Sequence, residues 1–196
     1  MLVLARDSGF KSPFGHKYGG EMEISEALSK IRAIPDYPIP GILFQDITPL
    51  LSHAESFQRV IKELSEVSDS YDFVAGIEAR GFILASAIAQ LKNVGFVPIR
   101  KKGKLPHATF TRTYGLEYGT DELQIHKDAL VAGSRVLLID DVLATGGTIQ
   151  AALDLLSDVG AHVAAVSVLI EISSLKGREK IHQHSPALSV HSLISH

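Results

Sequence analysis

The sequence contains no cysteine, and this absence excludes several classes of site at once. Without cysteine the chain can form no disulfide scaffold, no thiolate zinc site and no cysteine nucleophile. It also lacks any apolar run near the roughly 20 residues that a membrane-spanning helix needs. The opening residues MLVLAR form too short an apolar stretch for a signal peptide, and no basic region precedes them. We therefore expect a cytoplasmic protein with no membrane partner.

An excess of positive charge is absent as well. The 196 residues include 19 Lys and Arg against 22 Asp and Glu, which gives a formal net charge of -3 with histidine neutral. Because general nucleic-acid binders are usually basic, we expect no nucleic-acid partner. A small anionic ligand stays compatible with this charge, since it needs only a local cationic patch. With 45% hydrophobic and 21% charged residues, the composition is that of one globular domain.

The chain is predicted to consist of a leader and one domain. Residues 1–22 contain the aperiodic stretch DSGFKSPFGHKYGG, for which we predict a flexible leader. Residues 23–196 form the domain. In its first part, about 23–52, apolar spacing from Glu23 predicts a helix that Pro35 ends. The proline-rich stretch IPDYPIPGILFQDITPLL then predicts an ordered but irregular loop.

Strands and helices alternate in the rest of the sequence. Apolar runs predict strands at 71–77, 95–100, 135–140 and 162–172, and the segment 110–126 favours a hairpin. Helical patterns are found around 57–67, 82–91, 148–160 and 173–182. Buried strands alternating with helices predict an α/β fold, with a central mostly parallel sheet flanked by helices. We expect the histidine-rich end, with His182, His184, His191 and His196, to be a solvated tail.

One motif follows the strand at 135–140, where a ligand of such a sheet is expected to bind. Asp140 and Asp141 end this strand, and the loop VLATGGT then leads into a helix. Glycine lets the backbone wrap an oxyanion closely, and the helix N-terminus adds N–H donors and positive potential. Carboxylates beside such a loop repel phosphate and instead suit hydroxyl groups or a cation. A ribose 5-phosphate fits both features, with its phosphate in the loop and its hydroxyls on the carboxylates. The alternative is that a threonine merely caps the helix and the aspartates cap the strand.

Two further segments follow predicted strands. Arg80 comes after the strand at 71–77, in the turn Glu78-Ala79-Arg80-Gly81, where a guanidinium can bind a second oxyanion. The basic run Arg100, Lys101, Lys102 and Lys104 follows the strand at 95–100 and suits a polyanion. The alternatives are an ordinary turn with a surface arginine and a solvated basic face.

The segment LLIDDVLATGGT closely resembles the motif with which type I phosphoribosyltransferases bind phosphoribosyl diphosphate (PRPP). Other segments resemble the adenine phosphoribosyltransferases of this family, in the same order from about Ser25 to Lys180. They are YPIPGILFQDITPLL, GIEARGF, IRKKGKLP, YGLEYG, LQIHKDAL and SLKGREK. The resemblance implies the type I phosphoribosyltransferase fold, with a small N-terminal hood at about 23–52 and a flexible loop or hairpin.

The resemblance further implies that adenine and PRPP react to give AMP and diphosphate, with Mg²⁺ as cofactor. Mg²⁺ would be held mainly through PRPP and diphosphate, with no direct metal ligand from the protein. The 5-phosphate would lie in the loop of Ala144, Thr145, Gly146, Gly147 and Thr148. The diphosphate would meet Arg80, Lys101, Lys104 and Tyr118. Adenine would contact Leu43, Phe44 and Gln45 of the hood, although some members carry Arg where this chain has Gln45.

The catalytic residues implied by the resemblance are Glu117, Asp140, Asp141 and Arg80. Glu117 would handle a proton on an adenine ring nitrogen, while the aspartates orient the ribose. A homodimer is also implied. Two other functions remain open: a phosphoribosyltransferase for another purine, and a regulator that senses PRPP without catalysis.

Overall fold

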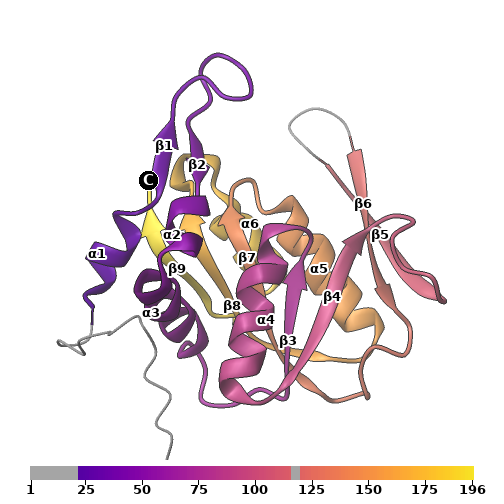
Figure 1. Cartoon of the computed structure of the whole chain (residues 1–196). Coiled ribbons are helices and arrows are strands. Elements are labelled where there is room, and N and C mark those ends of the chain that lie inside the picture. The colour runs from indigo at the N-terminus through magenta and orange to yellow at the C-terminus, as the bar shows by residue number, and fades with distance from the viewer. Residues whose placement is uncertain (1–21, 116–119) are drawn as a thin grey trace, which may run out of the picture.

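One seven-stranded sheet forms the centre of the molecule (Figure 1). The computed structural model describes residues 22–115 and 120–196. The strands are β3 (Phe73–Ile77), β4 (Gly95–Lys101), β5 (Thr109–Gly115), β6 (Thr120–His126), β7 (Arg135–Leu143), β8 (His162–Glu171) and β9 (Val190–Ser195). Their order is β5-β6-β4-β3-β7-β8-β9, and the pairs from β4 to β9 are parallel. In this sheet the pairs β4–β6 and β5–β6 are antiparallel and the other four are parallel, which confirms the mostly parallel α/β sheet.

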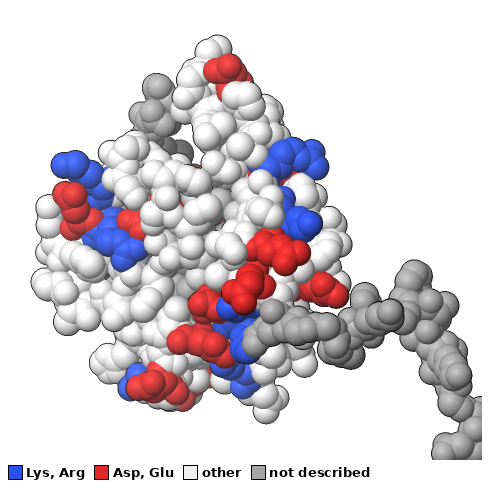
Figure 2. Space-filling model, turned by 90° about the vertical axis from the view of Figure 1, so that its left-hand side faces the viewer, with Lys and Arg blue, Asp and Glu red and all other residues white. Residues whose placement is uncertain are grey.

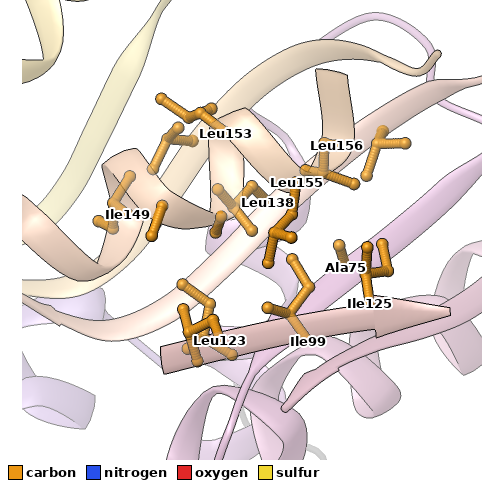
Figure 3. Close-up of a cluster of buried hydrophobic side chains, with 14 of the residues drawn as sticks. Ala75, Ile99, Leu123, Ile125, Leu138, Ile149, Leu153, Leu155 and Leu156 are labelled. Carbon is orange, nitrogen blue, oxygen red and sulfur yellow. The ribbon is translucent and has the colours of Figure 1, made fainter. Parts of the chain in front are cut away.

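Helices cover both faces of this sheet, because successive residues of its strands are apolar. On one face lie α5 (Gly147–Asp158) and α6 (Gly177–His184). On the other lie α1 (Ile24–Leu28), α2 (Thr48–Ser52), α3 (Ala54–Ser65) and α4 (Arg80–Lys92). Leu138 of β7 lies among the leucines of α5 (Figure 3), whereas its neighbours Leu137 and Ile139 join the opposite cluster. Each fully buried side chain of this kind contributes about 1.5–3 kcal/mol of transfer free energy.

Several predicted elements are present with shifted ends. The helix predicted at 82–91 begins at Arg80, which therefore lies in its first turn. The strand predicted at 135–140 continues to Leu143, so the two aspartates lie within β7 and do not end it. The helix predicted at 173–182 is divided into a 3-10 turn (Ser173–Leu175) and α6. The predicted hairpin is present as β5 and β6.

The first part of the domain differs from the prediction. Helix α1 ends at Leu28, well before Pro35, and the segment expected to be irregular contains regular elements. Strands β1 (Arg32–Ile34) and β2 (Phe44–Asp46) pair in the antiparallel sense, with Ile34 opposite Phe44. Helix α2 follows directly. Local apolar spacing could not reveal this pairing, because it joins residues on either side of a proline-rich turn. The hood is defined as residues 23–52, and its β1–β2 part projects beyond the upper end of the sheet in Figure 1; its boundary stays a prediction.

The histidine-rich end is not a tail, although His184, His191 and His196 are exposed as expected. Residues Val190–Ser195 form strand β9, which extends the sheet in parallel beside β8. Val190 is buried, and His191 beside it is exposed. His182 and His184 belong to α6, where His184 Nε2 lies 3.3 Å from Asp154 Oδ1. The short apolar pattern of this segment did not predict a strand, because the strand forms only by pairing with β8, about twenty residues earlier in the chain.

The leader predicted for residues 1–22 lies outside the described residues except for Met22, whose carbonyl accepts a hydrogen bond from Arg59. None of the helices in the described part is both long and apolar enough to span a membrane. On the face shown in Figure 2, basic and acidic side chains lie next to one another, and no wide area carries one sign of charge.

Candidate active site

The strand order predicts a ligand-binding crevice at the carboxyl ends of β3 and β7. Strand β4 pairs with one side of β3 and β7 with the other, while β8 follows beyond β7. The connections from β3 and from β7 therefore leave in opposite directions, which is the arrangement that binds ligands in open α/β sheets. The turn at 78–81 follows β3, and the acid pair and the loop at 144–148 belong to β7 and its connection. The structure thus brings together two motifs that lie about sixty residues apart.

The acid pair is almost completely buried. Asp140 and Asp141 are 8% and 7% exposed, and the backbone N–H of Asp141 donates to Asp140 Oδ1 at 2.9 Å. Burial raises the pKa of Asp140 well above its ordinary value, and the neighbouring Asp141 raises it further. Burial also raises the pKa of Asp141, although the guanidinium of Arg80 opposes this shift. Two adjacent carboxyl groups that share one positive partner are poised to interact with added positive charge or with hydroxyl donors.

Arg80 connects the acid pair to the hood. Its Nη2 lies 2.7 Å from Asp141 Oδ2, and its Nη1 donates to the carbonyl of Gln45 at 3.4 Å. The guanidinium carbon lies 5.2 Å from the centre of the Phe44 ring, within the range of a cation–π contact. Phe44 and Gln45 belong to β2, so one side chain joins two predicted adenine-binding positions to the predicted ribose-binding carboxylate. Leu43, the third, is 54% exposed.

Helix α4 approaches β7 closely because residue 81 is glycine. A Cβ atom on Gly81 would lie 3.0 Å from Asp140 Oδ1 and 3.0 Å from the carbonyl of Ile139. These separations are tighter than ordinary van der Waals contact, so a side chain here would require its neighbours to shift by a few tenths of an ångström. Gly81 therefore favours the close packing of α4, which carries Arg80, against β7.

The loop at 144–148 has the backbone geometry of an anion cradle. Gly146 has φ +78° and is the N-cap of α5, and Gly147 and Thr148 begin that helix. Such a left-handed cap turns successive N–H groups in one direction, and the helix adds its positive end. Thr145 is exposed, while Ala144 and Thr148 are half-buried. The loop can thus offer N–H groups and hydroxyls to a phosphate.

Acidic side chains of the protein itself already neutralise most of the basic run. Lys101 Nζ lies 3.0 Å from Asp121, and Lys102 Nζ lies 2.5 Å from Glu122. The hydrogen bond between Lys101 and Asp121 raises the pKa of the lysine and lowers that of the aspartate. Lys104 has no ion pair within the described part of the chain. Any anion that uses Lys101 must therefore compete with Asp121.

Arg100, the first cation of the run, is paired with Glu78 of the turn after β3. Its Nε lies 3.2 Å from Glu78 Oε2, and the backbone N–H of Lys101 donates to the same oxygen at 3.1 Å. Burial pushes the pKa of Glu78 upward, but the hydrogen bonds from Arg100 and Lys101 bring it below its ordinary value. These contacts tie β4 to the turn that carries Arg80.

Two predicted site residues, Glu117 and Tyr118, lie outside the described residues. The strands before and after them, β5 and β6, extend toward the upper side of the molecule in Figure 1, as β1 and β2 of the hood do. Tyr114, at the end of β5, was not singled out from the sequence. Its hydroxyl donates to Asp121 Oδ2 at 3.3 Å, so it contacts the same carboxylate as Lys101.

The segment SLKGREK contributes residues that the sequence did not assign to the site. Gly177 packs against the loop at Gly146, and the side chain of Lys180 reaches Gly147. Arg178 forms an ion pair with the buried Glu171 at the end of β8. The resemblance of this segment to the family was the only signal available, and it did not indicate a role for any residue in it.

Comparison with known proteins agrees with this geometry. A model of the phosphoribosyl transferase domain matches residues 47–194, most of the chain. The chain belongs to the phosphoribosyl transferase domain family. The match includes the turn at 78–81, the acid pair and the loop at 144–148, and it leaves the first part of the hood outside.

Relatives within the family are similar over most of their length. The adenine phosphoribosyltransferase of Rhizobium meliloti strain 1021 is 52% identical over 159 residues, which are 80% of this chain and 88% of the relative. A solved adenine phosphoribosyltransferase from Thermoanaerobacter pseudethanolicus is 44% identical and superposes with a TM-score of 0.83, covering 89% of this chain and all of that one. The enzyme of Giardia lamblia, solved with 9-deazaadenine, is 39% identical with a TM-score of 0.82 and covers 89% of this chain and 98% of its own.

Proposed function

We propose that this chain is an adenine phosphoribosyltransferase, which transfers the 5-phosphoribosyl group of PRPP to adenine and releases diphosphate. The observation that carries the proposal is the contact of Arg80 with both Asp141 and the hood. It links the acid pair, which precedes the loop at 144–148, to the proline-rich hood. The relatives that are about half identical to this chain and are named adenine phosphoribosyltransferases support it.

In the reaction, the bond from the anomeric carbon of ribose to the diphosphate oxygen breaks, and a bond from that carbon to a ring nitrogen of adenine forms. The proton of that nitrogen must leave, and Glu117 is the group we assign to it. Positive charge develops on the sugar, where Asp140 and Asp141 face it, and groups complementary to developing charge lower the barrier. Arg80, Lys101, Lys104 and Tyr118 are assigned to the leaving diphosphate.

The cradle of residues 144–148 is assigned to the 5-phosphate, and the hood to adenine. The ring of Phe44 packs edge-on against Tyr37 at 5.2 Å between centroids, and Tyr37, Ile39 and Leu43 are each about half exposed. Exposed apolar side chains beside a strand suit the flat faces of a purine, while backbone groups can bind its edge. The carbonyl of Gln45 accepts from Arg80, and no role is assigned to the side chain of Gln45.

The donor set of the crevice fits Mg²⁺ as a cofactor carried mainly by the substrate. Asp140 and Asp141 offer carboxylate oxygens, but no group of three or more His, Cys, Asp or Glu that could hold a metal is found among the described residues. Mg²⁺ commonly uses one or two carboxylates together with substrate phosphates and water. When bound, it would neutralise charge on the diphosphate, which helps this group to leave.

The test is to incubate the protein with PRPP and Mg²⁺ and with adenine, hypoxanthine or guanine in separate reactions. We expect AMP and diphosphate with adenine alone. Turnover with hypoxanthine or guanine but not adenine would identify an enzyme for another purine. No product with any base, together with measurable PRPP binding, would favour the non-catalytic sensor.

We also infer that the chain forms a homodimer, and the support is an exposed apolar strip on α4 and β4. Ile83, Leu91 and Phe96 are 42%, 53% and 37% exposed, and positions 83, 87 and 91 lie on one side of α4. A glutamate at Ile83 would be buried without a partner in such an interface. Ile83→Glu should therefore shift a dimer to monomer in size-exclusion chromatography with light scattering.

Val131→Glu is the matched control, because Val131 is 77% exposed in the connection between β6 and β7, outside this strip. It should leave the dimer intact. A monomeric wild-type protein would contradict the inference. A cytoplasmic location and the absence of nucleic-acid and membrane partners stay predictions.

A further inference from the structure

The first turn of α6 lies directly against the anion cradle. A Cβ atom on Gly177 would stand 2.2 Å from the carbonyl oxygen of Ala144 and 2.9 Å from the backbone nitrogen of Gly146. In turn, a Cβ atom on Gly146 would stand 2.8 Å from the carbonyl oxygen of Gly177. Only two glycines allow the backbones to approach this closely, so the position of α6 and the shape of the cradle depend on each other.

Arg178 holds α6 in this position from the opposite side. Its Nε donates to both oxygens of Glu171, at 2.9 and 3.1 Å, and its Nη2 donates to Ser192 Oγ at 3.0 Å. Glu171 is 6% exposed, and Ser192 Oγ donates to it at 2.8 Å. Because Glu171 ends β8 and Ser192 lies in β9, the helix is tied to the two last strands of the sheet. The direction in which its other side chains point is therefore fixed.

Lys180 lies one turn after Gly177, on the same side of α6. Its Nζ is 3.9 Å from the point where a Cβ atom of Gly147 would stand. The ammonium group thus lies beside Gly147, the first residue of α5 and part of the cradle.

Lys180 differs from its basic neighbours in having no acidic partner. Lys176 Nζ lies 3.9 Å from Glu179, and Arg178 is paired with Glu171. Across residues 22–115 and 120–196, Lys180 makes no ion pair. An unpaired cation beside the positive end of a helix is repelled by it, and a bound anion would relieve this repulsion.

We propose that Lys180 binds the 5-phosphate of PRPP and AMP and supplies the positive charge that the cradle lacks. The cradle itself offers neutral N–H groups and hydroxyls, while the cations at the ends of β3 and β4 are assigned to the diphosphate. The 5-phosphate carries close to two negative charges at neutral pH, and charged hydrogen bonds to phosphate are the strong ones. This inference rests on the proposed function and extends it to a residue outside the cradle motif.

The experiment compares the wild type with Lys180→Ala, Lys180→Arg and the control Lys176→Asn. The control removes a neighbouring cation, and asparagine tolerates the positive φ of 55° at position 176. Four constants are measured: KM for PRPP, KM for adenine, Kd for AMP and Ki for diphosphate as product inhibitor. Thermal unfolding shows whether each variant is folded.

We expect Lys180→Ala to raise KM for PRPP and Kd for AMP by about tenfold or more, as for the loss of a charged hydrogen bond. KM for adenine and Ki for diphosphate should change less than about twofold, because neither ligand carries the 5-phosphate. Lys180→Arg should recover most of the loss, and Lys176→Asn should behave as the wild type.

Two results would overturn the inference. One is a Lys180→Ala variant with unchanged constants for PRPP and AMP. The other is an equal loss for all four ligands, which would mean that Lys180 only supports the fold. A wild-type protein that makes no AMP would instead refute the proposed function, a result that needs no variant.

Discussion

Replacing Gly177 by alanine should displace α6 from the anion cradle. The new methyl group would stand 2.2 Å from the carbonyl oxygen of Ala144 and 2.7 Å from a methyl group of Leu143. Ordinary van der Waals contact begins at 3.4 Å, so the first separation is too short by 1.2 Å. Both neighbours of the new atom are held in place, one being backbone and the other a nearly fully buried leucine. The strain must therefore move α6, the loop, or both.

The size of this movement sets the expected effect. Binding and catalytic groups are held to within about 0.5 Å in working sites. A misplacement of about 1 Å can lower the rate of an enzyme about 100-fold. We therefore expect kcat/KM for PRPP to fall by about two orders of magnitude, and overpacking should lower the free energy of unfolding by about 1–3 kcal/mol.

The assay measures initial rates at varied PRPP concentration, together with urea unfolding of the same variants. Gly133→Ala is the matched control: Gly133 has φ +86°, and an added Cβ atom would meet nothing within 4 Å. It lies before β7, at the end of the sheet away from the cradle. Alanine there should cost about 1 kcal/mol through backbone strain and leave KM for PRPP unchanged. If Gly177→Ala kept the wild-type kcat/KM, the reasoning that α6 shapes the cradle would be refuted.

Two further predictions concern acidic residues. Glu117→Gln should lower kcat more than it raises KM for either substrate, because its assigned task is to move a proton; unchanged steady-state kinetics would contradict that role. Asp140→Asn should reduce the loss of stability with rising pH. Because burial raises the pKa of Asp140, the folded protein keeps this proton after the unfolded chain has lost it, near 3.8. The free energy of unfolding therefore falls as pH rises from that value to the folded pKa. The measurement is urea unfolding at several pH values, and the same slope against pH in the variant and the wild type would contradict this role of Asp140.

Much of the candidate site could be predicted from the sequence because its motifs are local. Asp140 and Asp141, the loop at 144–148 and the turn at Arg80 each directly follow a buried apolar run. Such positions fall at the carboxyl edge of a parallel sheet whatever its strand order. Their roles in binding stay predictions, but the structure does place these segments at the carboxyl ends of the neighbouring strands β3 and β7.

The pairing of strands and charges could not be predicted, because it depends on contacts between distant residues. Nothing near Lys101 in the sequence indicates that Asp121 will neutralise it across the β4–β6 pair. Likewise β1 needs β2, and β9 needs β8, before either short segment becomes a strand. For the same reason the sequence does not predict that β3 pairs with β7, the pairing that brings Arg80 to Asp141.

The contact of Arg80 with both Asp141 and the hood has a thermodynamic consequence for the affinities of the two ligands. A ligand that draws the guanidinium away from Asp141 also changes its contacts with Phe44 and the carbonyl of Gln45. The free energies of occupying the two halves of the crevice are then coupled through one side chain. By reciprocity, the factor by which a bound PRPP changes the affinity for adenine equals the factor by which adenine changes the affinity for PRPP. Removing the guanidinium should bring that factor toward one, so that the two ligands bind independently.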